Sequence, residues 1–157
     1  MRTADTAHPA GPAVSTRRVD QLLAHYGESH RDPRNEGIHM VAIPLIMLSL
    51  VGLIYAAHPV AAHLFLAASM VYYVRLGSVP FLLAMALVSA IILGLVYAMG
   101  ERVLPVSAAI FVGAWIAQFV GHKMEGRKPS FFEDLQYLWV GPLFVLSRLF
   151  LRLGIRW

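Results

Sequence analysis

Long stretches without charged side chains dominate this chain. No Asp, Glu, Lys or Arg occurs in 37–74, in 76–100 or in 103–122. A helix needs about 20 apolar residues to cross a bilayer core, so the first stretch has room for two crossings and each of the others for one. The pattern therefore predicts membrane-spanning helices at about 38–57, 60–74, 81–99 and 104–122.

A shorter amphipathic segment precedes the first of these spans. In 19–30 the apolar side chains and His30 fall within one stripe of a helix. Pro33 then ends this helix, because the residue before a proline disfavours helical geometry. We expect Asn35 to cap the next helix, which places His39 in its first turn.

The two ends of the chain differ from the spans. Residues 1–18 are rich in Ala, Pro and Thr and lack an apolar core segment, so we expect a mobile tail there and a single membrane-embedded domain over 19–157. After the fourth span, Gly141 and a following proline break the apolar run, and arginines recur every four residues in 148–156. A complete crossing would carry these arginines outside, against the positive-inside tendency. We therefore expect an interfacial or re-entrant pair of helices.

Composition narrows the class of protein further. Of 157 residues, 58% are hydrophobic and 14% charged, and none is cysteine. The absence of cysteine excludes a disulfide framework and a thiolate metal site, and nothing supplies the basic, aromatic face of a nucleic-acid-binding module. The expected fold is all-α: an integral membrane four-helix bundle with an N-terminal amphipathic helix and a C-terminal interfacial or re-entrant helix pair.

The distribution of basic residues predicts the orientation in the membrane. With the N-terminus inside, the outside turns hold Arg102 beside an acidic residue, whereas the inside segments hold most of the other basic residues: Arg17, Arg18, Arg31, Arg34, Arg75, Lys123, Arg127 and Lys128. This asymmetry favours a cytoplasmic N-terminus, in the inner membrane of a bacterium or the endoplasmic reticulum of a eukaryote. The polar segments 30–39 and 122–129 then both lie on the cytoplasmic side.

Three histidines and a carboxylate occur in these two polar segments. The break at the proline lets His30 and His39 reach one point from two helices, and His122 shares a helix face with Glu125. Two histidines and one carboxylate with open positions form the site of non-haem iron(II) oxygenases, although the same ligand types also bind zinc or manganese. The alternative interpretation is that these histidines only complete hydrogen bonds at the water interface.

Residues around these candidates fit either interpretation. Gln118 is a polar group in an apolar span, so it should face protein or a cavity rather than lipid. The small residues Gly113, Ala117 and Gly121 recur every four positions, which permits close helix approach. The basic residues near the two polar segments have two explanations. Either the positive-inside tendency alone accounts for them, or they bind a carboxylate or phosphate headgroup.

The order and spacing of these residues resemble a known family. The pattern is Tyr26-x3-His30-x4-Asn35-x3-His39, then Ile43-Pro44, Gln118-x3-His122, Glu125, Lys128-Pro129, Asp134-Leu135 and Gly141-Pro142. Over about residues 19–154 it is similar to the small membrane proteins grouped with the fungal 2-hydroxy fatty acid dioxygenase. The fungal pattern has its glutamate four residues after the histidine, whereas here it follows by three, which suggests a separate, bacterial-type branch.

The resemblance implies an iron(II)-dependent alpha-oxidation in which a 2-hydroxy fatty acid and O2 give a fatty acid one carbon shorter, a step in degrading the phytosphingosine base of sphingolipids. Carried over by position, Fe(2+) would be held by His30, His39 and His122, with Glu125 as a fourth ligand or a base. Residues expected to support these ligands by hydrogen bonds are Tyr26, Asn35, Gln118 and Asp134. Residues expected to bind the substrate carboxylate are Arg34, Lys123, Arg127 and Lys128.

Two other functional classes compete with this one. A non-enzymatic membrane protein that binds lipid or a small solute would use the histidines structurally, and the short polar second span with His63, Tyr72 and Tyr73 supports it. A hydrolase or a desaturase-like enzyme is the weaker alternative, because membrane di-iron desaturases and hydroxylases need many more histidines.

Overall fold

The structure, a computed structural model, describes residues 17–28, 32–124, 126 and 137–157, and every regular element in these ranges is helical. The elements in order are α1 (Arg18–Gly27), α2 (Pro33–Ala57), α3 (Pro59–Arg75), α4 (Val79–Met99), the 3-10 turn η1 (Gly100–Arg102), α5 (Val103–Met124) and α7 (Val140–Leu153). The all-α class is confirmed for the described residues. The predicted helices match α2 to α5, with the largest difference at the start of α2.

The start of α2 corrects one prediction. Asp32 is the N-cap residue, and its side chain accepts a hydrogen bond of 2.8 Å from the backbone N–H of Arg34. Pro33 occupies the first helical position, where its fixed φ suits a helix and its missing N–H leaves no bond unmade. Asn35 therefore lies fully buried inside the helix, so the prediction that it caps the helix is wrong. His39 consequently lies in the second turn rather than the first.

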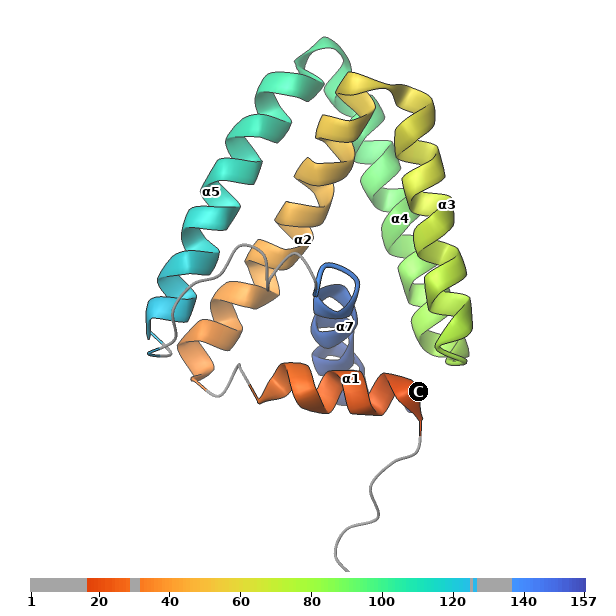
Figure 1. Ribbon diagram of the computed structural model, residues 1–157, viewed down its shortest axis with the longest axis vertical. Helices are drawn as coiled ribbons and strands as arrows, with labels where there is room; N and C mark the ends of the chain where they lie inside the picture. The colour runs from red at the N-terminus through yellow and green to blue at the C-terminus, as the bar shows by residue number, and fades with distance from the viewer. Residues whose placement is uncertain (1–16, 29–31, 125, 127–136) are drawn as a thin grey trace, which may run out of the picture.

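Helices α2 to α5 form two diverging pairs (Figure 1). Helix α2 packs along α5, and α3 lies beside α4. The pairs meet at the end of the molecule that carries η1 and separate toward the other end, which we call the open end. Near the meeting end α2 and α5 approach closely because residue 52 is glycine: a Cβ on Gly52 would lie 2.1 Å from Oγ of Ser107.

The open end is filled by the first and last helices. In Figure 1, α1 lies across this end and α7 occupies the space between the two pairs. Trp139, directly before α7, donates a hydrogen bond of 3.0 Å from Nε1 to Oγ of Ser69 in α3. Arg148 of α7 forms an ion pair of 3.0 Å with Glu36 in the first turn of α2. Helix α7 itself packs against α1, α2 and α4, and it lies on the inner side of both pairs (Figure 1).

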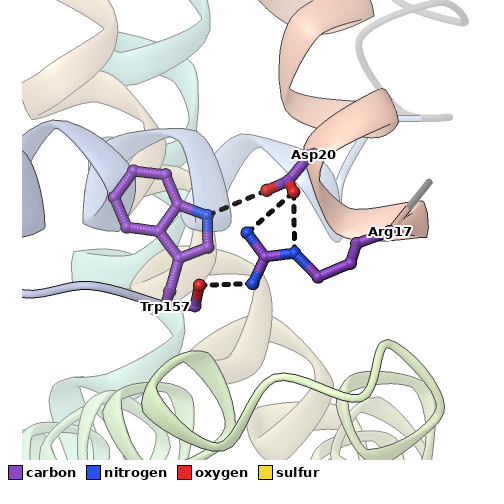
Figure 2. A network of polar contacts seen from close by, with 3 residues as sticks. All are labelled: Arg17, Asp20 and Trp157. Atoms are coloured by element: carbon purple, nitrogen blue, oxygen red, sulfur yellow. Dashed lines mark hydrogen bonds and ion pairs between the residues drawn. The ribbon is translucent and has the colours of Figure 1, made fainter. Parts of the chain in front are cut away.

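The C-terminal residue Trp157 binds the first turn of α1 (Figure 2). Its indole N–H donates a hydrogen bond of 3.1 Å to Oδ1 of Asp20. Its carbonyl oxygen accepts a hydrogen bond from the guanidinium of Arg17. The same guanidinium forms an ion pair of 2.8 Å with Asp20. The indole ring packs on Phe81 of α4 and Phe150 of α7, with ring centroids 5.5 and 6.2 Å away. Trp157 therefore connects α1, α4 and α7, and α7 ends at the open end of the molecule.

We expect Trp157→Ala to lower the midpoint of thermal unfolding. The change removes the ring packing and the indole hydrogen bond, with an expected loss of about 2 kcal/mol, below the range for a fully buried aromatic side chain. Thermal unfolding of the detergent-purified protein, followed by circular dichroism, measures it. Ile155→Ala is the control, because that side chain is 40% exposed, and its midpoint should stay near that of the wild type. Equal midpoints for the two variants would contradict the connecting role of Trp157.

The outward faces of α4 and α5 are strongly apolar. Exposed aliphatic side chains recur every four residues, at Leu83, Leu87, Ile91 and Leu95 of α4 and at Val112, Ile116 and Val120 of α5. The helical runs Pro33–Ala57 and Val79–Met124 are long and apolar enough to cross a membrane, and only 39% and 28% of their most apolar windows are buried inside the protein. The second run folds back on itself at η1 (Figure 1). Exposed apolar faces of this extent support association with a membrane.

Candidate metal and substrate site

Two buried histidines from different helices face each other toward the open end of the α2–α5 pair. His39 of α2 is fully buried and His122 of α5 is 7% exposed. Their ring centroids are 5.0 Å apart and the ring planes cross at 84°. The structure thus brings together one histidine from each of the two polar segments. Their role as metal ligands stays a prediction.

A backbone contact determines the tautomer of His39. Its Nδ1 lies 2.9 Å from the carbonyl oxygen of Asn35, one turn earlier in α2. A carbonyl oxygen can only accept, so Nδ1 carries the hydrogen and the lone pair lies on Nε2. Metal-binding histidines are commonly held in this way through their other nitrogen. The chemistry of this buried imidazole therefore fits a divalent transition metal.

Gly121 provides the space that this arrangement needs. A Cβ at this position would lie 2.3 Å from Oδ1 of Asn35 and 3.5 Å from Cε1 of His39. A side chain there would displace Asn35, whose carbonyl oxygen holds the ring of His39. Of the two glycines in the small-residue repeat, only Gly121 lies where a side chain would collide with a neighbour. A Cβ on Gly113 would have no neighbour within 4 Å. The repeat alone did not indicate that Gly121 belongs to the candidate site.

Gln118 lies one turn from His122 on the same helix and borders a small pocket. The side chain is 3% exposed, and within the described part of the chain its Oε1 has no hydrogen-bond partner. The pocket has a volume of about 20 Å³, and its other lining residues are Tyr26, Ile43, Ile46, Met47, Tyr137, Leu138, Gly141 and Pro142. The expectation that Gln118 faces protein or a cavity is confirmed, because the side chain is buried and lines this pocket.

Tyr26 reaches this pocket from α1. It is 6% exposed, and its ring packs on Tyr137 and on Phe144 of α7, with centroid distances of 5.4 and 5.1 Å. Ile43 of α2 belongs to the same buried cluster. The apolar stripe predicted for the N-terminal helix is therefore the face that attaches α1 to α7 and α2, beside the pocket.

A larger apolar pocket adjoins the small one. It has a volume of about 100 Å³ and shares Ile43, Met47 and Pro142 with the pocket of Gln118. Its other lining residues come from α2, α4 and α7: Pro44, Met85, Val88, Val145 and Leu146. The two pockets together place a buried amide oxygen next to an apolar space between three helices.

Two of the residues predicted to bind the substrate carboxylate lie in the described ranges, and both lie at the surface rather than among the buried side chains. Arg34 and Lys123 are exposed. Arg34 lines a separate groove of about 480 Å³ between α2 and α5, together with Gly113 and Ala117. His63, which belongs to the short polar second span, has its Nε2 2.7 Å from the hydroxyl of Tyr97 in the α3–α4 pair.

Several predicted site residues lie outside the described residues: His30, Glu125, Arg127, Lys128 and Asp134. Helix α1 was expected to continue to about residue 30, but it ends at Gly27. Within the ranges that the structure describes, no group of three or more His, Cys, Asp or Glu side chains could hold a metal ion. His39 and His122 are two of the four predicted ligands, and metal binding by all four residues stays a prediction.

Comparison with known families identifies the class of this protein. The model of one protein family matches this chain over residues 16–153. The chain belongs to the family described as 2-hydroxy-palmitic acid dioxygenase Mpo1-like. No curated protein and no solved structure is similar enough to count as a match. The family resemblance found in the sequence is thus confirmed over nearly the whole chain, and the family description names a dioxygenase acting on a 2-hydroxy fatty acid.

Proposed function

We propose that this protein is a membrane-embedded, iron(II)-dependent dioxygenase that shortens 2-hydroxy fatty acids by one carbon. The observation that carries the proposal is the buried pair of His39 and His122 in a member of this family. The two rings come from different helices, and Nε2 of His39 carries a lone pair. Two imidazoles with a carboxylate and open positions are the ligand set of non-haem iron(II) oxygenases.

The proposed setting is a bundle of four membrane spans, α2 to α5, within one membrane-embedded domain over residues 19–157. The exposed apolar faces of these helices support it, because such faces are stable against lipid. Arg34, Arg75 and Lys123 lie at the ends of helices that point away from η1, whereas η1 carries Arg102 beside Glu101. By the positive-inside tendency, the open end and the N-terminus would face the cytoplasm.

The proposed metal ligands are His39 and His122 together with His30 and Glu125, which lie outside the described residues. Fe(2+) bound there would supply an oxygen-activating centre with open positions. The carbonyl oxygen of Asn35 holds the ring of His39 in one tautomer and one orientation. Burial of both histidines excludes bulk water from the reacting groups.

The proposed substrate is amphipathic, and the site has matching polar and apolar parts. Basic residues at the open end would attract the carboxylate electrostatically; those proposed are Arg34, Lys123, Arg127 and Lys128, of which the last two lie outside the described residues. The alkyl chain would enter the apolar pocket beside Met47. A long chain exceeds its volume of about 100 Å³, so side chains must move, and methionine adapts readily because it is unbranched and flexible.

The proposed reaction balances with O2 as the oxidant. The bond between C1 and C2 breaks, C1 leaves as CO2, C2 becomes the carboxyl carbon of the shortened acid, and one water forms. Because O2 accepts all four electrons, the reaction needs no separate reductant.

The test uses the detergent-purified protein after anaerobic loading with Fe(II). With 2-hydroxyhexadecanoic acid and O2 we expect pentadecanoic acid by mass spectrometry, with about one O2 consumed per acid on an oxygen electrode. A chelator should abolish turnover, and Fe(II) but not Zn(II) should restore it. Hexadecanoic acid is the control substrate and should give no product. Absence of both bound iron and product would instead favour a non-enzymatic lipid- or solute-binding protein with structural histidines.

A further inference from the structure

Gln118 presents a buried hydrogen-bond acceptor that the protein does not satisfy within its described residues. The side chain is 3% exposed, and its Oε1 has no partner there. Buried polar groups in native proteins are almost always paired, so an exception calls for a ligand or water that donates to it. The side chain lines the small pocket of about 20 Å³ rather than an outer surface.

The position of Gln118 relative to the histidine pair follows from helix geometry. Gln118 lies four residues before His122 in α5, and Ile43 lies four residues after His39 in α2, which is about 6 Å along each helix axis. Because the two helices run antiparallel (Figure 1), both steps lead away from the open end. Gln118 and Ile43 therefore form the layer next to the histidine pair, and both line the same pocket.

The size and surroundings of the pocket match one hydroxyl group on an alkyl chain. A volume of about 20 Å³ holds a group the size of one water molecule. The adjoining apolar pocket of about 100 Å³ shares Ile43, Met47 and Pro142 with it. A hydroxyl on the carbon where an alkyl chain begins would thus meet an amide oxygen, while the chain itself meets apolar side chains.

We infer that Gln118 Oε1 accepts a hydrogen bond from the 2-hydroxyl group of the fatty acid and is thereby the residue that selects 2-hydroxy acids over unhydroxylated acids of equal length. The inference rests on the proposed function, because it takes the proposed substrate as its ligand. A buried acceptor that is left unpaired discriminates strongly against an analogue that lacks the donor. Gln118 would therefore determine specificity and also position the substrate, because a hydrogen bond to the 2-hydroxyl group fixes the place of C2, the carbon that carries it.

The test is equilibrium binding to the full-length protein in lipid nanodiscs, measured without O2, both as purified and after treatment with a chelator. The three ligands are 2-hydroxyhexadecanoic, 2-fluorohexadecanoic and hexadecanoic acid; fluorine is similar in size to a hydroxyl but donates no hydrogen bond. We expect the wild type to bind the 2-hydroxy acid about tenfold more tightly than the other two. In Gln118→Met this preference should disappear because affinity for the 2-hydroxy acid falls, while affinity for hexadecanoic acid stays the same.

Two further variants separate recognition from a structural role. Gln118→Glu retains an acceptor oxygen at the same position and should retain the preference for the 2-hydroxy acid. Ser107→Ala removes another fully buried polar group from α5 near the meeting end, and it should behave as the wild type. Two results would overturn the inference. One is an equal loss of affinity for all three ligands in Gln118→Met, and the other is equal affinity of the wild type for the 2-hydroxy and 2-fluoro acids.

The result is independent of whether the proposed oxidation occurs. Preferential binding of the 2-hydroxy acid that depends on residue 118, without any O2 consumption, would support the recognition by Gln118 and contradict the proposed reaction. Turnover of 2-hydroxyhexadecanoic acid by the wild type, together with an unchanged binding preference for this acid in Gln118→Met, would do the reverse.

Discussion

Replacing His39 by alanine is expected to abolish both iron binding and turnover. The change removes the fully buried imidazole of the pair. The hydrogen bond from its Nδ1 to the carbonyl oxygen of Asn35 leaves the lone pair on Nε2, where a metal would bind. Loss of a residue that merely supports a ligand typically costs 10–100-fold in metal affinity or activity, so loss of the ligand itself should cost more than about 100-fold. Iron content by elemental analysis and production of pentadecanoic acid measure the two effects.

A second histidine variant controls for general damage. His63→Ala also removes a hydrogen-bonded imidazole, whose Nε2 lies 2.7 Å from the hydroxyl of Tyr97 in the α3–α4 pair. That variant should keep its iron and its turnover. If His39→Ala retained iron and turnover with full recovery of the protein, the assignment of His39 as a ligand would be wrong. Loss of both in each variant would show that the effect is not specific to the pair.

Replacing Gly121 by alanine is expected to lower both thermal stability and iron content, although only one methyl group is added. The new Cβ would lie 2.3 Å from Oδ1 of Asn35, so either the asparagine or helix α5 must shift. Overpacking of this kind typically costs about 1–3 kcal/mol. Because the carbonyl oxygen of Asn35 holds the ring of His39, the shift should also disturb the candidate ligands. Thermal unfolding and iron content after loading measure the two consequences.

The same substitution at Gly113 is the matched control. Gly113 lies in the same helix, and a Cβ there would have no neighbour within 4 Å. Alanine is a better helix former than glycine by about 1 kcal/mol, so Gly113→Ala should be neutral or slightly more stable, with unchanged iron content. Equal behaviour of the two variants would contradict the role given to Gly121. A stability loss in Gly121→Ala without any loss of iron would limit that role to helix packing.

The helices could be predicted from the sequence because the signals for them are local. Uncharged runs of sufficient length predicted α2 to α5, and the family pattern over residues 19–154 agreed with the family match over 16–153. The start of α2 was harder, since a proline both ends the preceding helix and favours the first position of the next. Asn35 looked like a cap for that reason, whereas Asp32 is the cap and Asn35 is buried inside the helix.

The sequence by itself determined the helical class, the apolar runs and the family, because the length of an apolar run and the spacing of a motif are properties of the chain alone. Only the tertiary structure decided that His39 lies against His122, that Gly121 makes room for Asn35, and that Gln118 borders a pocket closed by α1 and α7. These facts depend on the register of two antiparallel helices and on the insertion of α7 between diverging pairs (Figure 1). Register and insertion arise from side-chain packing between segments far apart in sequence, which no local pattern specifies.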